Sequence, residues 1–221
     1  MISRELLADN GKGDGMFLKY YVVGDVQTNC YIAAADTSKS CVVIDPGDEA
    51  QYIMSETKKL GYTIDAVILT HGHFDHILGV NDIKEKTGCR VYIPEAEKEL
   101  CATPALNCSI MHRGPYSCTA DVYFKDNDII KEAGIVFKAI MTPGHTAGSA
   151  CLYVEDEAVL FSGDTLFNMS VGRTDLPTGS MSALCASVRN RLYVLPDNVT
   201  VYPGHGPETD IAFEKKNNMY V

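Results

Sequence analysis

A dense group of potential metal ligands lies in the segment Thr70-His71-Gly72-His73-Phe74-Asp75-His76, where four imidazole or carboxylate side chains fall within six residues. Because His71 and His73 alternate, both can point the same way from an extended loop. Asp75 and His76 come at the start of an expected helix and project differently. Imidazole and carboxylate groups together suit divalent metals such as zinc or iron. The segment therefore predicts a metal site, with Asp75 and His76 available to a second ion.

Three further potential ligands stand at turns later in the chain. His145 lies in a Pro-Gly-His-Thr sequence, Asp164 in Gly-Asp-Thr and His205 in Pro-Gly-His-Gly, each just after a segment expected to be a strand. Taken singly, such residues are more often turn residues or helix caps. Together with the first cluster they predict one shared site assembled from four strand ends, in which Asp164 offers a carboxylate able to bridge two cations.

The expected elements alternate between strands and helices. Apolar, β-branched and aromatic runs predict strands over residues 17–23, 30–34, 40–44, 66–69, 90–93, 122–124, 135–141, 150–154, 158–162 and 199–202. Helical spacing and turn residues predict helices over residues 48–60 and 77–86, from about 94, and over 181–192. Runs of strands with helices outside them favour an α/β sandwich, formed as a single domain over residues 1–221. Periodicity alone does not distinguish this sandwich from a doubly wound sheet.

The segment from Ala102 to Ser117 holds three Pro or Gly residues and little periodicity, which predicts a long loop. Loops of that length are often functional, so this one is a candidate substrate wall. It contains His112, the one histidine outside the predicted ligand set. We expect His112 to be an exposed loop residue and not a catalytic group.

Composition excludes several classes of protein. The formal charge is −10 and the cationic residues are scattered, so there is no basic patch of the kind that binds nucleic acid. Arg4, Glu5 and Asp9 interrupt any apolar run near the start, and no run approaches the roughly 18 apolar residues of a membrane span. We therefore expect a cytoplasmic protein that acts on a small molecule, with neither a nucleic acid nor a membrane as partner. The sequence does not indicate an oligomeric state.

Eight cysteines raise the question of disulfides or a thiolate zinc site. No Cys-x-x-Cys spacing occurs, and several cysteines stand in apolar runs, such as Cys41 before Val-Val-Ile and Cys151 before Leu-Tyr-Val. Cysteines in such surroundings behave as small hydrophobic residues. We predict that they are buried thiols, not disulfide or zinc ligands.

The motifs, taken in order, resemble the metallo-β-lactamase superfamily. The chain carries an H-x-H-x-D-H signature, a downstream Gly-His-Thr, a Gly-Asp-Thr and a late Gly-His, and the resemblance spans about residues 29–218. It implies an αββα sandwich of the metallo-β-lactamase type, with two mixed β-sheets flanked by helices. It further implies that a first metal is bound by His71, His73 and His145, a second by Asp75, His76 and His205, and that Asp164 bridges them.

Outer motifs resemble the glyoxalase II-like (hydroxyacylglutathione hydrolase-like) branch of small hydrolases. They are Thr-Asn-Cys-Tyr at 28–31, Asp-Pro-Gly at 45–47, Gly-Asp-Thr-Leu-Phe at 163–167 and Gly-Arg-Thr-Asp at 172–175. We expect Asn29 and Asp45 to be scaffold residues near the site. Arg173 either contacts an anionic substrate or forms a salt bridge with Asp175. Full glyoxalase II enzymes continue into a helical domain that binds glutathione, whereas sixteen residues follow His205 here, so glutathione recognition does not carry over.

The resemblance implies a metal-dependent hydrolase of a thioester or related acyl substrate. Two divalent ions, zinc first and iron or manganese as alternatives, would supply a metal-bound hydroxide at neutral pH, and Asp75 would orient it as a catalytic residue. A thiolate leaving group needs little help from an acid, because the pKa of a thiol is about 8.5. The acidic chain would still attract anionic or carbonyl-bearing substrates to the cations.

Four other functions are compatible with parts of the pattern. A persulfide dioxygenase with one iron shares much of the ligand set, and a non-catalytic metal-binding protein would keep the site without the reaction. A diiron module that reduces oxygen or nitric oxide is disfavoured by His73 and by the early end of the chain. A secreted β-lactamase is disfavoured by the lack of an export signal and by Asp164, where many such enzymes have cysteine.

Overall fold

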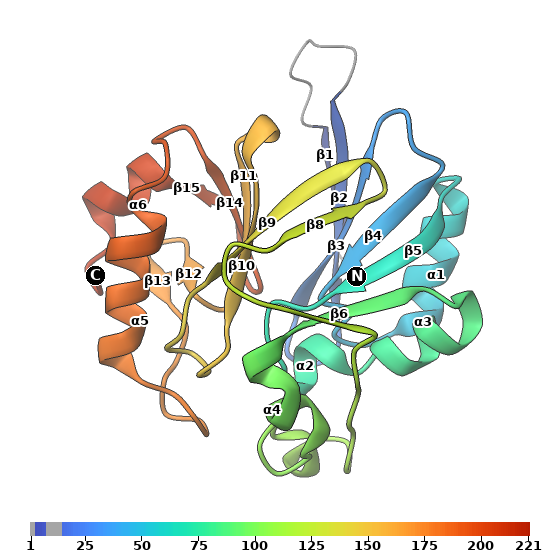
Figure 1. Ribbon diagram of the computed structural model, residues 1–221, viewed down its shortest axis with the longest axis horizontal. Coiled ribbons are helices and arrows are strands. Elements are labelled where there is room, and N and C mark those ends of the chain that lie inside the picture. The colour runs from blue at the N-terminus through green and yellow to red at the C-terminus, as the bar shows by residue number, and fades with distance from the viewer. Residues whose placement is uncertain (1–2, 8–14) are drawn as a thin grey trace.

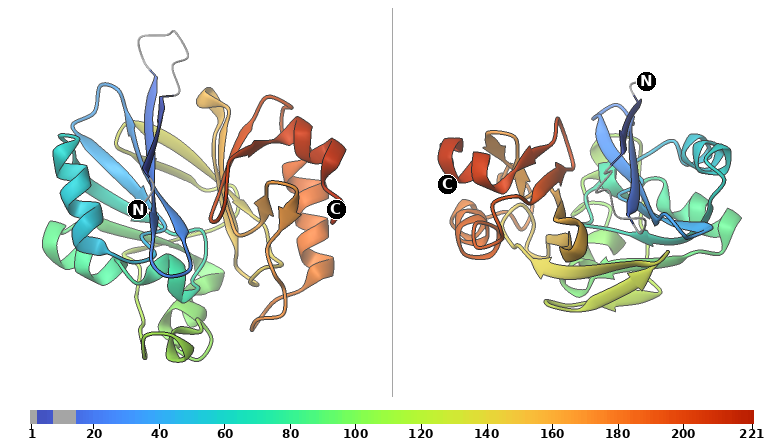
Figure 2. Two further views of the ribbon diagram at one scale, coloured as in Figure 1. Left: turned by 180° about the vertical axis from the view of Figure 1, so that it is seen from behind. Right: turned by 90° about the horizontal axis from the view of Figure 1, so that it is seen from above.

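Two β-sheets packed face to face, with helices on the outside, form the computed structural model of the protein (Figures 1 and 2), which describes residues 3–7 and 15–221. One sheet has seven strands and the other has six. Both are mixed, because antiparallel strands are followed by the parallel pairs β4–β5, β5–β6 and β6–β7 in the first and by β11–β14 in the second. The predicted αββα sandwich is therefore confirmed.

The first sheet follows the chain in order, β1 to β7. Its strands are β1 Ser3–Leu7, β2 Met16–Val23, β3 Thr28–Ala35, β4 Ser40–Ile44, β5 Thr63–Ile68, β6 Arg90–Pro94 and β7 Val122–Phe124. The helices of this half are α1 Ala50–Lys59, α2 Phe74–Ile77, α3 Val80–Thr87 and α4 Lys98–Ala102, with short 3₁₀ turns at Glu95–Glu97 and Ser109–Met111. Ile53 of α1 and Ile83 of α3 belong to one cluster of buried side chains with Val43 and Val67 of the sheet. Figure 1 shows both helices on the outer side of that sheet.

The second sheet has the strand order β15-β14-β11-β10-β9-β8. Its strands are β8 Ile129–Glu132, β9 Ile135–Met141, β10 Ala150–Val154, β11 Val159–Gly163, β14 Thr200–Pro203 and β15 Thr209–Asp210, and β12 Leu166–Phe167 with β13 Ser170–Val171 forms a separate ribbon. A 3₁₀ turn spans Glu155–Glu157, α5 Met181–Ser187 continues into a π-helical turn at Val188–Leu192, and α6 is Ile211–Asn217. None of the helices within the described residues is long and apolar enough to cross a membrane.

Aromatic side chains join the two sheets in the central core. Phe161 of the second sheet lies with its ring centroid 5.2 Å from that of Tyr31 in the first sheet. It also contacts its neighbours Phe137, at 6.4 Å, and Tyr202, at 5.9 Å. The sheets therefore meet through closely packed rings, which fixes where the ends of their strands lie relative to one another.

One predicted helix is divided in the structure. The stretch 77–86 was expected to be continuous, but α2 ends at Ile77 and α3 begins at Val80. The amide of Gly79 donates to the carbonyl of Pro46 at 2.8 Å in place of the helical bond to Asp75. This contact with the 45–47 turn interrupts the helix and leaves α2 as a separate turn that carries Asp75 and His76.

Several strands were not predicted. They are β1, β8, β12, β13 and β15, and the strands β12, β13 and β15 contain two residues each. Strands this short carry no pattern of their own, because pairing with a neighbour defines them. All eight cysteines are free thiols, as predicted, and seven of them are buried, whereas Cys185 is partly exposed.

Replacing Phe161 by alanine tests the core contact between the sheets. Phe161 is 1% exposed, so the Phe161→Ala variant should lose about 3 to 5 kcal/mol of unfolding free energy in urea titrations. Val136 on β9 is 44% exposed, and Val136→Ala should change that free energy by less than about 0.5 kcal/mol. Equal losses in the two variants would contradict this description of the core.

Candidate metal centre

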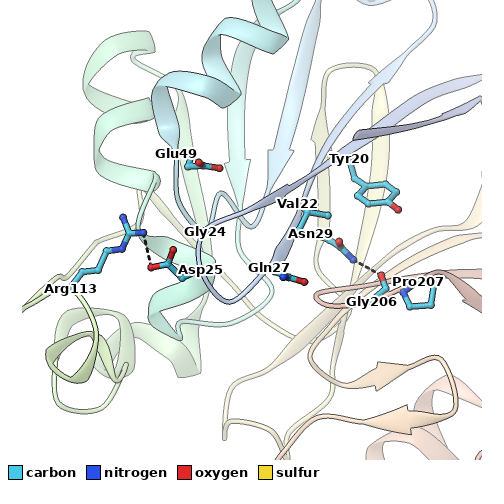
Figure 3. A pocket seen from close by; sticks show the side chains of 10 residues that line it. All are labelled: Tyr20, Val22, Gly24, Asp25, Gln27, Asn29, Glu49, Arg113, Gly206 and Pro207. Atoms are coloured by element: carbon cyan, nitrogen blue, oxygen red, sulfur yellow. Dashed lines mark hydrogen bonds and ion pairs between the residues drawn. The ribbon is translucent and has the colours of Figure 1, made fainter. Parts of the chain in front are cut away.

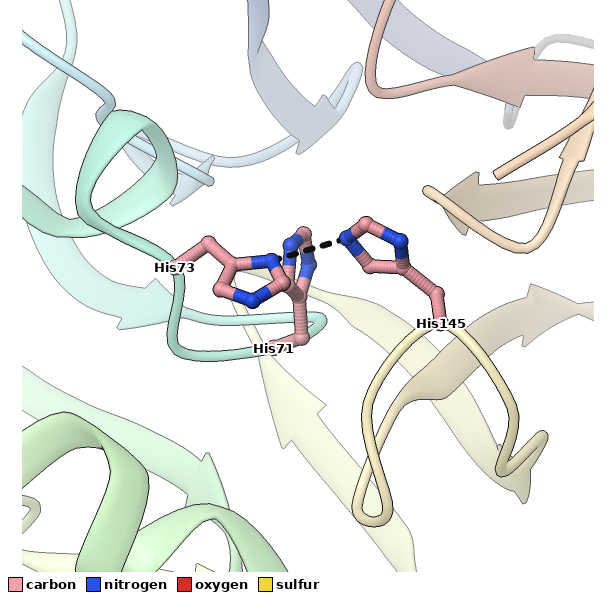
Figure 4. Close-up of side chains that lie close together, drawn as sticks. All are labelled: His71, His73 and His145. Atoms are coloured by element: carbon pink, nitrogen blue, oxygen red, sulfur yellow. Dashed lines mark hydrogen bonds between the residues drawn. The ribbon is translucent and has the colours of Figure 1, made fainter. Parts of the chain in front are cut away.

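The structure brings all seven predicted ligand side chains together where the strands end. His71 follows β5, His145 follows β9, Asp164 follows β11 and His205 follows β14. Three groups have potential ligand atoms within 4.8 Å of one another: His71, His73 and His145; Asp75, His76 and His205; and Asp45, His71 and His76. Figure 4 shows His71 and His73 on one loop facing His145 on another.

Asp164 lies between the first and second of these groups. Its Oδ1 is 3.4 Å from Nε2 of His76, and its Oδ2 is 3.5 Å from Nε2 of His145 and 3.6 Å from Nε2 of His205. One carboxylate thus reaches imidazoles of both groups. This is the arrangement that a bridging carboxylate requires.

Unpaired buried atoms are concentrated in this cluster. Within the described residues, five buried side-chain polar atoms lack a hydrogen-bond partner, and four of them are His71 Nε2, His73 Nε2, His76 Nε2 and Asp164 Oδ1. Buried polar atoms are normally paired, because an unpaired one costs about 1 to 3 kcal/mol. Nitrogen and carboxylate oxygen are also the donors that zinc and iron accept. The residues therefore fit a pair of divalent cations.

Second contacts fix the orientation of the rings. His76 donates from Nδ1 to Asp45 Oδ2 at 2.9 Å, and His145 donates from Nδ1 to the carbonyl oxygen of Arg173 at 2.7 Å. With Nδ1 protonated, Nε2 carries the lone pair that can bind a metal. In two more rings Nδ1 also faces an oxygen acceptor, which leaves the lone pair on Nε2. His71 Nδ1 lies 3.1 Å from Thr70 Oγ1, and His205 Nδ1 lies 3.2 Å from the carbonyl oxygen of Gln27.

Asp45 has a larger role than the scaffold position expected for it. Asp45 is buried, and its carboxylate accepts three hydrogen bonds. The donors are the Thr70 amide at 2.8 Å, the Thr70 hydroxyl at 2.6 Å and Nδ1 of His76 at 2.9 Å. Because its oxygens are occupied by these donors, Asp45 orients His76 and is not itself a free ligand. Its backbone has φ 50°, in the left-handed region, a strain of about 1 kcal/mol or more that the surrounding contacts must hold.

Burial keeps two of the imidazoles neutral. Burial lowers the pKa of His71 well below its usual value and lowers the pKa of His73 to about 3, with the neighbouring His145 adding to the effect on His73. Both rings are therefore neutral at neutral pH. The neutral ring is the form that binds a metal ion.

The opposite holds for two other imidazoles. Burial by itself lowers the pKa of His76, but the carboxylates of Asp164, Asp45 and Asp75 outweigh it and raise the pKa well above its usual value. Burial likewise lowers the pKa of His205, but the hydrogen bond with Asp75 and the charge of Asp164 raise it overall. The second group therefore holds protons more tightly than the first.

Gly204 is required by the crowding beneath the site. A Cβ atom at this position would lie 2.2 Å from Asp164 Oδ1 and 2.8 Å from Cε1 of His76. Any larger residue would displace one of these two side chains. The glycine before His205 thus belongs to the geometry of the cluster as well as to the turn.

A cavity of about 590 Å³ lies over the cluster and is lined by five of the seven predicted ligands, His73, Asp75, His145, Asp164 and His205. The long loop contributes Cys108, Met111 and His112 to its wall. His112 is exposed, as expected, and its ring also stacks on Phe74 with centroids 4.1 Å apart and planes 17° apart. The wall position of His112 was not predicted.

Arg173 forms the salt bridge with Asp175 that is one of its two predicted roles. Its guanidinium forms two hydrogen bonds of 2.7 Å with Asp175, and both side chains are exposed. The side chain also lines the cavity. The main-chain contact of Arg173 with His145 was not predicted, because a carbonyl group carries no sequence signal.

A second cavity, of about 560 Å³, is lined by residues of β2 and of the turn after it (Figure 3). The ion pair of Arg113 with Asp25 stands at one end, and Tyr20 and Pro207 stand at the other. Asn29 lines it too and donates from its amide to the carbonyl of Gly206 at 2.9 Å. None of the seven predicted ligands lines this cavity.

Comparison with known proteins gives matches over most of the chain. The family described as the metallo-beta-lactamase superfamily matches residues 23–205. The probable metallo-hydrolase YqgX of Bacillus subtilis (strain 168) is 37% identical over 201 residues, which are 90% of this chain and 94% of that protein. The hydroxyacylglutathione hydrolase GloC of Haemophilus influenzae is 32% identical over 199 residues, covering 88% of this chain and 93% of that protein.

Solved structures agree with this family. The chain is similar to the BLEG-1 B3 metallo-beta-lactamase, with TM-score 0.88, 37% identity and coverage of 92% of this chain and 99% of that one. It is similar to TTHA1623 in a di-iron-bound form, with TM-score 0.82, 32% identity and coverage of 91% and 99%. ETHE1 from Myxococcus xanthus gives TM-score 0.72, 26% identity and coverage of 99% and 84%. With its fold, its cluster and a family match over most of its length, this chain belongs to the metallo-β-lactamase superfamily.

Proposed function

We propose that this member of the superfamily is a metal-dependent hydrolase of thioesters or related acyl substrates. In this proposal His71, His73 and His145 would hold a first divalent cation, Asp75, His76 and His205 would hold a second, and Asp164 would contribute its carboxylate to both. One observation carries the proposal. Three buried imidazole nitrogens and one carboxylate oxygen without a hydrogen bond converge beneath a cavity of about 590 Å³.

The bound cations would lower the pKa of a shared water to near neutrality and polarise the carbonyl group of the substrate. Side chains of the protein would position the attacking water. Asp75 lines the cavity, and its Oδ2 accepts the Thr28 hydroxyl at 3.4 Å and lies 3.2 Å from Nε2 of His205. An oxygen held in this way can accept a hydrogen bond from the attacking water and orient it toward the acyl carbon, the role predicted for Asp75.

The choice of an acyl substrate draws support from the leaving group and from relatives. A thiolate leaves without a strong general acid, because the pKa of a thiol is about 8.5. GloC is named a hydroxyacylglutathione hydrolase and BLEG-1 a B3 metallo-beta-lactamase, so both relatives are named for hydrolysis of a carbonyl compound. Zinc is the proposed metal. The di-iron form of TTHA1623 keeps iron as an alternative, and manganese is the third candidate.

Zinc binding should depend on pH differently at the two groups of ligands. His76 and His205 have raised pKa values, so a metal that binds there must displace protons, and the affinity should fall about tenfold per pH unit for each displaced proton as the pH drops. His71 and His73 have lowered pKa values and are already neutral, so the first site should lose less affinity. Competition with chromogenic chelators between pH 7.5 and 5.5 measures both affinities. If the zinc affinities of the two sites changed by the same factor per pH unit, the assignment of the ligands to two unlike sites would be contradicted.

Hydrolysis itself is tested on the metal-loaded protein with S-lactoylglutathione, other thioesters, lactones and β-lactams. We expect thiol release from thioesters, and we expect Asp75→Asn to lower kcat/KM by at least about 100-fold. Asp197 is a surface carboxylate paired with Lys215 at 2.5 Å, so Asp197→Asn is the matched control and should keep full activity.

Two results would replace this proposal. One iron per chain with rapid oxygen uptake on glutathione persulfide would assign a persulfide dioxygenase. Tight binding of two metals with no turnover of any acyl substrate would assign a non-catalytic metal-binding protein.

A further inference from the structure

The wall of the cavity over the cluster is mainly apolar. Four segments contribute apolar side chains to it: the turn between β2 and β3, helix α2, the long loop, and the stretch from β12 to residue 176. Their apolar side chains are Val26, Phe74, Cys108, Met111, Phe167, Val171 and Leu176. A substrate whose carbonyl lies over Asp164 therefore has apolar surface on several sides.

Some of this wall is exposed to solvent. Met111 is 70% exposed and Val26 is 42% exposed, although both are large apolar side chains that line a cavity. Apolar groups gathered around one cavity mark a surface that binds a ligand. Each methylene that such a surface covers contributes roughly a three- to fourfold increase in affinity.

The cationic side chains near the wall are already paired. Arg173 lines the cavity but makes its two hydrogen bonds with Asp175. Arg113 lines a small adjoining pocket and pairs with Asp25 at 3.1 Å and Asp48 at 3.0 Å. No lysine lines either space within the described residues. A glutathione conjugate would bring two carboxylates to a wall whose guanidinium groups are engaged.

We propose that the substrate carries an uncharged apolar acyl chain, which lies against Met111, Phe74 and Leu176 while its carbonyl lies over the cluster. This inference rests on the proposed hydrolase function and names its substrate class. In the reaction, the oxygen of water bonds to the acyl carbon and the carbon–sulfur bond breaks. The sulfur keeps the electron pair, and the products are the carboxylic acid and the thiol.

A series of straight-chain thioesters of N-acetylcysteamine, from acetyl to octanoyl, tests the proposal, because the uncharged thiol stays constant. We expect kcat/KM to rise about threefold per methylene until the wall is covered. Met111→Asp should lower kcat/KM at least tenfold for octanoyl and less than twofold for acetyl. The neighbouring Ile110 is 57% exposed and does not line the cavity, so Ile110→Asp is the matched control and should leave both values unchanged.

If kcat/KM did not change with the length of the acyl chain, this inference alone would be overturned. A kcat/KM for S-lactoylglutathione tenfold above that for the octanoyl thioester would overturn it too. Hydrolysis of none of the thioesters would instead overturn the proposed function, and this inference with it.

A separate observation concerns Glu97, which sequence analysis did not single out. Glu97 is 1% exposed, and its Oε2 accepts the Gly72 amide at 2.8 Å. Its Oε1 accepts the Gly148 amide and the Thr146 hydroxyl, both at 2.9 Å. None of the ion pairs among the described residues involves Glu97. Three donors from two loops therefore stabilise this buried carboxylate.

The two loops are those that carry the first group of ligands. Gly72 stands between His71 and His73, and Thr146 follows His145 directly. A carboxylate accepts on both oxygens, whereas the glutamine of the same shape would place an NH₂ group against at least one of the donors. The loops are thus connected by a group that its amide analogue cannot replace.

From these contacts we infer that Glu97 is a positioning residue, which holds the His71–His73 loop at the correct distance from His145. It is not among the residues that line the cavity. Residues that orient metal ligands in this way typically contribute a factor of about 10 to 100 in metal affinity.

The test is the zinc affinity of the first site, measured by chelator competition, together with thermal unfolding. Glu97→Gln should weaken zinc binding by about 10- to 100-fold. Glu214 provides a matched control, because it is also fully buried and accepts hydrogen bonds from three donors, Met169 N, Thr209 Oγ1 and Asn218 Nδ2. Glu214→Gln should lower the unfolding temperature comparably but leave the zinc affinity unchanged.

Thr146→Val is a milder variant, because it keeps the side-chain shape and removes only the hydroxyl that donates to Glu97 and contacts Ser149 Oγ at 2.6 Å. It should weaken zinc binding about two- to tenfold, and it decides the question if Glu97→Gln does not fold. Wild-type zinc affinity in a destabilised Glu97→Gln, or in Thr146→Val, would overturn the positioning role and leave Glu97 a structural residue.

Discussion

The whole structure depends on burying, in one place, a set of nitrogen and oxygen atoms that the protein itself does not satisfy. Four of these atoms form no hydrogen bond among the described residues, although His76 Nε2 and Asp164 Oδ1 lie 3.4 Å from each other. A buried polar atom without a hydrogen bond costs about 1 to 3 kcal/mol. The core between the sheets, with Phe161 against Tyr31, must offset that cost. Hydrogen bonds to Nδ1 must also fix the orientation of the imidazole rings. The Asp45 carboxylate accepts this bond from His76, and the Arg173 carbonyl accepts it from His145.

The electrostatics divide the cluster into two unlike halves. His71 and His73 are neutral because burial disfavours their charged form, whereas His76 and His205 lie beside carboxylates that favour protonation. Asp164 is the side chain that reaches both halves. A cation that entered the second half would therefore have to displace protons.

Membership of the superfamily accounts for the cluster more fully than for the substrate. The ligand groups lie at strand ends of the shared fold, but the walls above them belong to loops. Cys108, Met111 and His112 come from the long loop, and Phe167 and Leu176 from the ribbon and the turn after it. Loops vary without disturbing the sheets that position the candidate ligands. The chemistry and the specificity are thus supplied by separable parts of the chain.

The sequence by itself determined which side chains are candidate ligands and at which strand ends they stand, and the order of its motifs implied the sandwich through a family resemblance. The H-x-H-x-D-H spacing and the glycine turns before His145 and His205 are local features. Strands such as Ser40–Ile44 and Ile135–Met141 were predicted with the bounds that the structure has, because their apolar runs are local too.

Only the tertiary structure decided the supporting contacts. Asp45 orients His76 from 31 residues away, and Glu97 joins loops 25 and 49 residues away, although in sequence it is one of three alternating glutamates. The interruption at Gly79 likewise depends on the carbonyl of Pro46. Burial and hydrogen-bond partners are set by residues distant along the chain, so no local pattern reveals which acidic side chain the fold encloses.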